Sequence, residues 1–320
     1  MVSLYVLVPA IAGLGDTWER LGRGDPLWLT AALGLEIISF AAYAALFRTA
    51  FDSPDLRIGW GGSARITLAG VAATRLLAMA GVGGIVLTVW ALRRLGMAGG
   101  EVTRRLATFL ILLYAVYMAA LVVGGVGLRS GLLAGPAPFA LTVLPAVFGA
   151  LVIAAALVIA AVSGDLDQAL ARVSAARGRG ARWAAALATA PATLSSGVKG
   201  ALGLLRTRDP GLLGAVGWWA FDVGVLWACL RAFGGEATIA VVVMAYFVGM
   251  LANVLPVPGG IGAVDGGMVG ALIGFGVSGG LALVAVLSYR AFSFWIPTVP
   301  GAVAYAQLLR EPPANDGAQR

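Results

Sequence analysis

Five ionisable side chains lie inside segments that are otherwise apolar, and they are the residues most able to do chemistry. They are Glu36, Arg75, Asp222, Asp265 and Arg290. A charged side chain at the centre of a bilayer costs at least about 2.5–3.5 kcal/mol, so each predicts either a function or a place in a buried ion network. For Glu36 and Asp222 both interpretations stay open. For Asp265 and Arg290 we favour function, because they flank an interrupted apolar stretch.

Arg290 and a helix start favour an anionic ligand. Its guanidinium is planar, permanently charged and suited to phosphate. A half-helix beginning after Pro258 would point amide groups and a positive dipole end at the same place. We expect a lipid phosphate there, with Asp265 neutralising a headgroup amine or carrying a proton. Asn253 is either a ligand or a helix C-terminal cap. The predicted substrate-binding residues are Arg290, Asp265, Asn253, Gly259, Gly260, Gly262, Arg75, Glu36 and Asp222.

Composition places these charges in a membrane protein. The 320 residues are 60% apolar and only 12% charged, whereas soluble domains average about 45–50% and about 25%. The chain has no histidine and a single cysteine, so we expect no metal site, no cofactor and no intrachain disulfide. The net charge of +7 does not predict nucleic-acid binding, because the basic residues sit in short loops between apolar spans.

Several stretches are long and apolar enough to cross a bilayer, which takes about 20 residues. They are 27–47, 106–127, 139–163, 211–232 and 281–305. Residues 2–15 are apolar but short, and are either part of a further span or a helix entering at an angle. A signal peptide is a weaker interpretation, because no basic region precedes them. We therefore expect an all-α polytopic protein with about six full spans.

Two further apolar stretches, 64–95 and 237–275, are interrupted. Glycine loosens the backbone and proline removes an amide donor, so each stretch predicts two half-helices joined at a turn. The predicted breaks contain Gly81, Gly83 and Gly84 in the first stretch and Pro256 and Pro258 in the second.

Arginine clusters set the expected orientation. The loops at 93–105 and 164–210 are rich in arginine and should be cytoplasmic, as should the C-terminus. The two interrupted stretches then become re-entrant hairpins that enter from opposite faces. Residues 180–205 are predicted to form an interfacial amphipathic helix or helix pair, with a tight re-entrant pair as the alternative.

The two halves resemble each other at an offset of 180 residues. Each half contains a span, a broken hairpin and another span, in opposite senses, which predicts an inverted-topology repeat. In transporters, interrupted segments at matching positions point to the binding site. The expected division is residues 1–163 as the first repeat, 164–210 as a cytoplasmic or interfacial linker, 211–310 as the second repeat and 311–320 as a disordered cytoplasmic tail.

One run of residues resembles a known family. Asn253-Val-Leu-Pro-Val-Pro-Gly-Gly-Ile-Gly-Ala-Val-Asp265, followed by Gly276, Tyr289-Arg290, Trp295, Pro297 and Gly301, is similar to the lysylphosphatidylglycerol synthase transmembrane family. That family includes the flippase domain of bacterial multiple peptide resistance factors. The resemblance implies translocation of a membrane phospholipid or a polyprenyl-phosphate-linked substrate in the bacterial inner membrane. It does not imply aminoacyl transfer, because no synthase domain follows residue 310.

Three alternatives to a lipid translocase remain. One is an ion-coupled transporter of a small solute, with Asp265, Glu36 or Asp222 carrying the proton. Another is a non-transporting partner of a lipid-modifying synthase. A membrane-embedded transferase is disfavoured, because the sequence has neither histidine nor a nucleophile motif, and we expect no enzyme activity. Small-residue faces such as Gly266-Gly267 can pack helices within one chain or in a homodimer.

Overall fold

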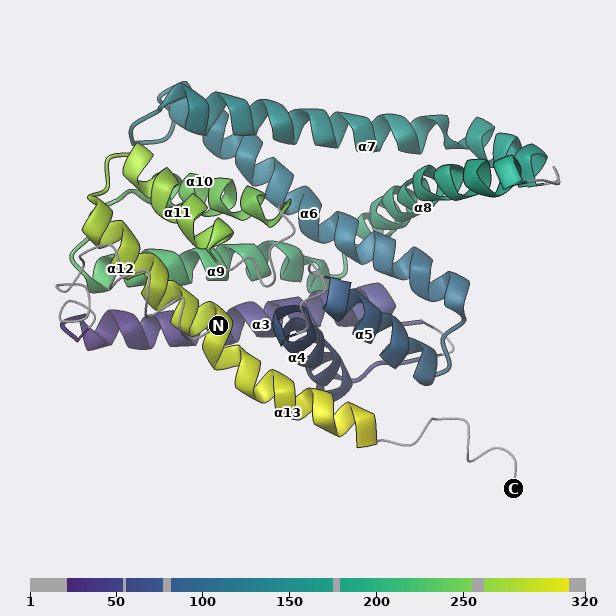
Figure 1. Ribbon diagram of the computed structural model, residues 1–320, viewed down its shortest axis with the longest axis horizontal. Helices are drawn as coiled ribbons and strands as arrows, with labels where there is room; N and C mark the ends of the chain where they lie inside the picture. Colours follow the sequence, from purple (N-terminus) through teal and green to yellow (C-terminus); the bar gives the residue numbers. More distant parts are fainter. Residues whose placement is uncertain (1–21, 54–55, 77–81, 175–178, 255–261, 311–320) are drawn as a thin grey trace.

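The computed structural model describes residues 22–53, 56–76, 82–174, 179–254 and 262–310, with only the helix path for 163–190. Within these ranges every regular element is helical, which confirms the all-α prediction (Figure 1). The helices are α3 (Pro26–Phe51), α4 (Trp60–Leu76), α5 (Val82–Arg94), α6 (Gly99–Arg129), α7 (Phe139–Ser174), α8 (Arg179–Thr207), α9 (Leu213–Ala232), α10 (Ile239–Met250), α11 (Ala263–Gly274), α12 (Gly279–Arg290) and α13 (Ile296–Arg310), with short turns η1 (Pro210–Leu212), η2 (Leu251–Val254) and η4 (Ala291–Trp295).

The predicted spans are confirmed. Five helical segments of the described chain are long and apolar enough to cross a membrane: Pro26–Phe51, Gly99–Arg129, Phe139–Val162, Pro210–Ala232 and Gly279–Arg310. The stretch 2–15 lies outside the described residues. On α7 the apolar side chains of Leu151 and Val158 are 64% and 60% exposed. Water would not tolerate such a surface along a whole helix, whereas lipid does, so the protein is a multi-pass membrane protein.

Both interrupted stretches form pairs of half-helices, α4 with α5 and α10 with α11. Gly81, Pro256, Pro258, Gly259 and Gly260 fall outside the described residues. The prediction for two other glycines was wrong, because Gly83 and Gly84 lie inside the first turn of α5.

Gly84 serves close packing. A Cβ atom there would lie 2.3 Å from Thr74 Oγ1 and 2.5 Å from the Gly70 carbonyl oxygen on α4. The Gly84 amide donates to Thr74 Oγ1 at 3.0 Å, so the side chain of α4 satisfies one of the free amides at the start of α5.

The 180-residue offset also relates the helix boundaries of the two halves. Adding 180 to the bounds of α5 gives 262–274 and adding it to those of α6 gives 279–309, which match α11 and the pair α12–α13. Gly96 and Gly276, which end α5 and α11, have φ of +96° and +94°. The two turns also share the same hydrogen bonds, Met97 N to Leu92 O and Val277 N to Leu272 O, each 3.0–3.1 Å long. This pattern is the Schellman ending of a helix, which needs the left-handed conformation that glycine adopts freely.

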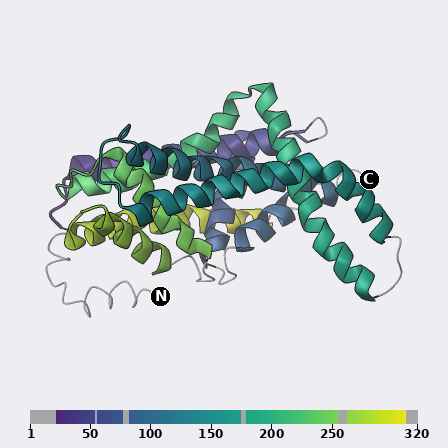
Figure 2. The ribbon, with the colours of Figure 1, turned by 90° about the horizontal axis from the view of Figure 1, so that it is seen from above.

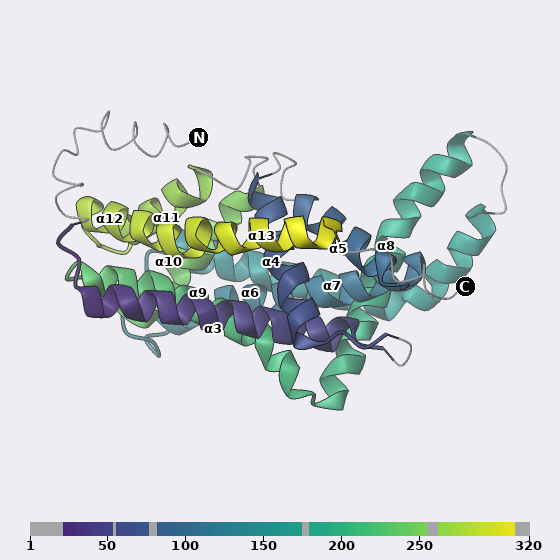
Figure 3. The same ribbon diagram turned by 90° about the horizontal axis from the view of Figure 1, so that it is seen from below.

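The repeat mates α3 and α9 lie side by side and run in opposite directions (Figures 1 and 3). The Asp25 amide donates to the Ala232 carbonyl at 2.9 Å at one end. Ser39 Oγ donates to the Trp218 carbonyl at 2.9 Å in the middle. Near the other end, a Cβ on Gly214 would lie 2.2 Å from the Ala42 carbonyl oxygen, so the backbones touch. Antiparallel mates are what a two-fold axis in the membrane plane produces, and the arrangement fits the predicted inverted repeat.

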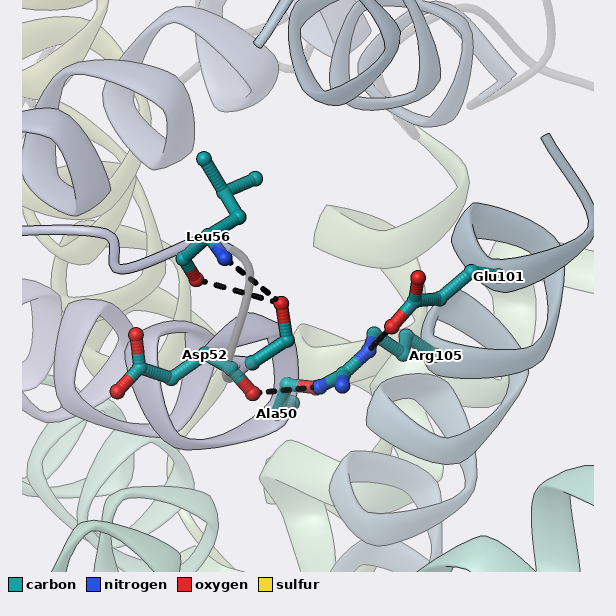
Figure 4. Close-up of polar contacts among 6 residues, drawn as sticks. Ala50, Asp52, Leu56, Glu101 and Arg105 are labelled. Carbon is teal, nitrogen blue, oxygen red and sulfur yellow. Dashed lines mark hydrogen bonds and ion pairs between the residues drawn. The ribbon is translucent and has the colours of Figure 1, made fainter. Parts of the chain in front are cut away.

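The C-terminal end of α3 is fixed by a side chain from α6 (Figure 4). Arg105 Nη1 donates to the carbonyls of Ala50 and Asp52 at 3.1 and 2.7 Å. Its Nε donates to Glu101 at 2.8 Å, one turn earlier on α6. The last carbonyls of a helix lack intrahelical partners, and the arginine satisfies one of them while bridging two spans.

The described residues between the two halves lie mainly in the helices α7 and α8. α7 continues unbroken to Ser174, so the boundary expected at residue 163 falls inside a helix. Residues 179–207 form the single helix α8, with Pro191 inside it, and not a pair. α7 and α8 meet away from the other helices (Figures 1 and 2). The C-terminal part of α8 packs on α6, since a Cβ on Gly200 would lie 2.2 Å from Thr108 Oγ1.

Substitution of a hairpin glycine tests the close packing of α10 and α11. A Cβ at Gly249 would lie 2.7 Å from the backbone nitrogen of Met268, so we expect Gly249→Ala to lower the melting temperature of the protein in detergent. Overpacking typically costs about 1–3 kcal/mol. The matched control is Gly34→Ala inside α3, where nothing lies within 4 Å. It should keep or raise the melting temperature, because alanine favours helix by up to about 1 kcal/mol. Equal melting temperatures for the two variants would contradict the packing.

Candidate functional site

A cavity of about 620 Å³ lies where the two halves meet. Residues of α3, α4, α5, α6 and α7 from the first half line it together with those of α9, α10, α11, α12, η2 and η4 from the second. It brings together most of the predicted site residues that the structure describes. Those that line it are Glu36, Arg75, Gly84, Asp222, Asn253 and Arg290. A second pocket, of about 320 Å³, is lined by loop residues such as Glu236 and contains no predicted site residue.

Asp222 is held by two tyrosines. It projects from α9 and is 5% exposed. Its Oδ2 accepts a hydrogen bond from the hydroxyl of Tyr246 on α10 and another, 3.1 Å long, from Tyr289 on α12. Both tyrosines are fully buried, at 0% and 2% exposure. A buried tyrosine needs a hydrogen-bond partner. From the sequence, that rule indicates that Tyr246 in its apolar helix needs a hydrogen-bond partner. It does not identify Asp222 as that partner.

Glu36 faces the same carboxyl group from α3. It is 3% exposed and lines the same cavity as Asp222. Glu36 Oε2 and Asp222 Oδ1 are both buried, and neither has a donor among the described residues. The two spans that form the repeat pair thus each contribute one carboxyl group to a common cavity.

Arg75 binds the backbone of a distorted helical turn. The turn η4 is π-helical, with the Ile296 amide donating to the Ala291 carbonyl five residues back. Residue 297 is proline and has no amide hydrogen, so the Ser293 carbonyl lacks its ordinary helical donor. Arg75 replaces it, with Nη2 to Ser293 O at 2.5 Å and Nη1 to Phe294 O at 2.7 Å. We had expected a substrate-binding arginine, and the structure gives its guanidinium this backbone role at the cavity wall.

The ring of Phe294 lies close to two positive charges. The Cζ atom of Arg75 is 5.0 Å from the ring centroid and that of Arg290 is 5.3 Å from it. Cation–π attraction to one ring offsets part of the repulsion between the two guanidinium groups. Phe294 carries no signal that would single it out in the sequence.

Asp265 and Arg290 are paired with each other. Arg290 Nε forms an ion pair with Asp265 Oδ1, and Arg290 is 8% exposed. Asp265 Oδ2 accepts from the Gly262 amide at 2.9 Å, which caps the start of α11. Gly262 itself has φ of +86°, a conformation that favours glycine. The carboxylate expected to meet a headgroup amine therefore positions Arg290 and closes the helix start instead.

Asn253 lies at the end of η2 beside the cavity. Its Nδ2 donates to the Met250 sulfur at 3.3 Å, and the side chain is exposed. No capping bond to a helix carbonyl is among its described contacts, so the residue remains available as a polar group at the cavity wall.

The cavity reaches an apolar surface between α5, α6 and α7. Four of its lining residues are well exposed: Val82 at 45%, Ile85 at 38%, Tyr114 at 50% and Phe148 at 43%. The charged residues Glu36, Asp222 and Arg290 line the same cavity and are buried. The site therefore has a charged floor and an apolar rim, which we call the mouth.

The fold and this cavity define a polytopic membrane protein built from two repeats around buried charges. The chain belongs to the family described as the lysylphosphatidylglycerol synthase TM region, whose model matches residues 1–301. The family match confirms the resemblance drawn from the second hairpin. The region that names the family is a transmembrane domain and not a catalytic one.

Two relatives from Methanothermobacter thermautotrophicus are described as UPF0104 membrane proteins. One is 32% identical over 117 residues, which is 34% of this chain and 35% of the relative. The other is 32% identical over 91 residues, which is 28% of this chain and 26% of the relative. The matched parts are thus about a third and about a quarter of the relatives' lengths.

Exchange of Arg75 for lysine tests its backbone role. A single ammonium group cannot reproduce the planar fork that reaches two carbonyls, so Arg75→Lys should leave a buried acceptor unsatisfied. We expect a loss of about 1–3 kcal/mol, seen as a lower melting temperature in detergent. Arg65→Lys, ten residues earlier on α4, is the control, because Arg65 Nε donates to the Gly61 carbonyl in an exposed setting at 3.3 Å. Similar melting temperatures for both variants would exclude the proposed fork.

Proposed function

We propose that this protein translocates an anionic membrane lipid, with the headgroup passing through the cavity while the acyl chains stay in the membrane. The observation that supports this most is the mouth, where Val82, Ile85, Tyr114 and Phe148 are both cavity-lining and exposed. A site for a small polar solute has no need of an apolar opening on the lipid-facing side. An amphiphile needs both surroundings at once, a polar floor and an apolar exit.

The size and charge of the cavity agree with a lipid headgroup. Small-molecule sites commonly enclose about 300–1,000 Å³, and a volume of about 620 Å³ falls within that range. Arg290 and Arg75 bring two permanent positive charges to the floor, and guanidinium groups suit phosphate oxygens. The substrate class we propose is an anionic phospholipid or a polyprenyl-phosphate-linked headgroup. The family name refers to lysylphosphatidylglycerol, a phospholipid with a phosphate group, and it supports a lipid substrate.

The setting we propose is the inner membrane of a bacterial cell, with the C-terminus in the cytoplasm. The arginines of residues 93–105 support this orientation, because positive loops stay on the cytoplasmic side. We also propose that the chain has no enzyme activity of its own, and that a lipid-modifying synthase is a natural partner for it. A homodimer through the small-residue face of α11 is a further proposal, since Gly266 and Gly270 have open space around them.

Blocking the mouth tests the lipid path. Cys229 is the single cysteine and is fully buried, so Cys229→Ala gives a background for labelling. Ile85→Cys, coupled to a bulky maleimide and reconstituted in liposomes, should reduce translocation of a fluorescent anionic phospholipid to the rate of protein-free liposomes.

The matched control is Val152→Cys on α7, since its parent residue is 39% exposed, against 38% for Ile85, and does not line the cavity. Labelling there should leave translocation unchanged. Equal inhibition at both positions, or at neither, would count against a path through this mouth.

A further inference from the structure

Two carboxyl groups in the cavity have no role in the lipid path described so far. Glu36 and Asp222 are 3% and 5% exposed and line the same cavity from the packed helices α3 and α9. One oxygen of each, Glu36 Oε2 and Asp222 Oδ1, is buried without a donor in the described part of the chain. A buried acceptor without a donor costs about 1–3 kcal/mol, more when charged, so a missing hydrogen is the simplest completion of this pair.

We propose that Glu36 and Asp222 together form a proton-binding site, and that proton binding there is coupled to translocation of the anionic lipid. The inference rests on the proposed function and adds an energy source to it. One proton, taken from the water on one side of the membrane, is held between the two carboxyl groups and released on the other side. No covalent bond other than the O–H bond forms or breaks.

The charges around the pair support a single shared proton. Arg75 and Arg290 supply two positive charges to the cavity. Asp265, Glu36 and Asp222 would supply three negative charges if all were ionised. One proton on the pair makes the cluster neutral, which is the favourable state away from water. The other titratable groups that face the pair are Cys229 on α9 and the hydroxyls of Tyr246 and Tyr289.

A proton fits the pair better than a metal cation does. Two carboxyl groups buried in one cavity cannot easily both ionise, and neighbouring carboxyl groups share a proton in well-known sites of other proteins. The hydroxyls of Tyr246 and Tyr289 both donate to Asp222 Oδ2. Their hydrogens occupy lone pairs of that oxygen, which are then not available to bind a cation. Arg75 and Arg290 would also repel a cation. Calcium and magnesium ions take about six or more oxygen ligands, and the two carboxyl groups supply four oxygens.

The position of the pair gives a physical reason for coupling. When the proton leaves, the pair gains a negative charge in the cavity that also contains Arg75 and Arg290, the arginine that we assign to the headgroup. The ionised pair and an anionic headgroup then compete for the same positive charges. Protonation removes that competition, so the proton and the lipid anion bind best together. By thermodynamic reciprocity, the lipid also favours the protonated pair.

The experiment uses the full chain in liposomes that carry a fluorescent phosphatidylglycerol and a pH gradient. With the wild-type protein, the lipid should become enriched in the leaflet that faces the alkaline side. A gradient of about one pH unit limits the enrichment to about tenfold for one proton per monoanion. Glu36→Gln and Asp222→Asn should lose this enrichment. Glu101→Gln, which changes an acid paired with Arg105 near the start of α6, should keep it.

A second measurement tests whether the pair binds a proton, and it does not depend on lipid transport. Infrared spectra of the purified protein at neutral pH should contain a protonated-carboxyl band that is lost in both Glu36→Gln and Asp222→Asn and kept in Glu101→Gln. A band unchanged in the first two variants overturns the proton site.

The remaining outcomes separate the two proposals. Translocation that ignores the pH gradient overturns the coupling and leaves the lipid path intact. Enrichment driven by a sodium gradient overturns the choice of the proton. Failure of the wild-type protein to translocate any anionic lipid overturns the proposed function and the coupling together, and the infrared band still decides whether the pair binds a proton.

Discussion

Two arginines and three carboxyl groups share one region inside the apolar helices, and the cost of taking them out of water constrains the helices around them. Tyr246 and Tyr289 hold Asp222 from two further helices. Arg290 pairs with an acid on α11, and Arg75 reaches across to η4. Breaking one partner from a buried pair costs about 3–5 kcal/mol, so these helices are bound to one another through their charges.

The two halves share a scaffold but differ where the site lies. Their turns at Gly96 and Gly276 have nearly the same geometry. α6 is continuous, whereas its mate is divided by η4 between α12 and α13. Tyr117 stands in α6 at the position that matches Pro297, so the first half keeps the amide hydrogen that the second half lacks. The cavity thus lies between two similar halves. Its floor is asymmetric because Pro297 and Arg75 create the π-helical turn and its side-chain contact in the second half only. π-helical turns of this kind are frequent at functional sites.

A lipid in transit meets two environments at the same time, and the cavity offers both. Its buried end contains permanent charges, while its exposed end contains Val82, Ile85 and Phe148, which resemble lipid in polarity. The Glu36–Asp222 pair lies between the repeat mates, α3 and α9, at the contact that any rocking of one half against the other would alter. A change in the charge of the pair therefore alters both the binding of the headgroup and the packing of the two halves.

The spans, the two interruptions, the offset of 180 residues and the five intramembrane charges were all predictable from the sequence. These features depend on local composition and on spacing along the chain. The residue-level roles of Gly83 and Gly84 were predicted wrongly, because the sequence does not say whether a glycine bends a backbone or lets another helix approach.

Only the tertiary structure decided which charges meet. Arg75 was expected at a substrate and binds the carbonyl of Phe294, 219 residues away. Asp265 was expected at a headgroup amine and forms an ion pair with Arg290 while capping α11. Glu36 meets Asp222 because α3 and α9 pack antiparallel. Such partnerships depend on how each helix is rotated and tilted against its neighbours, and that is fixed by packing across the whole molecule and by no local pattern.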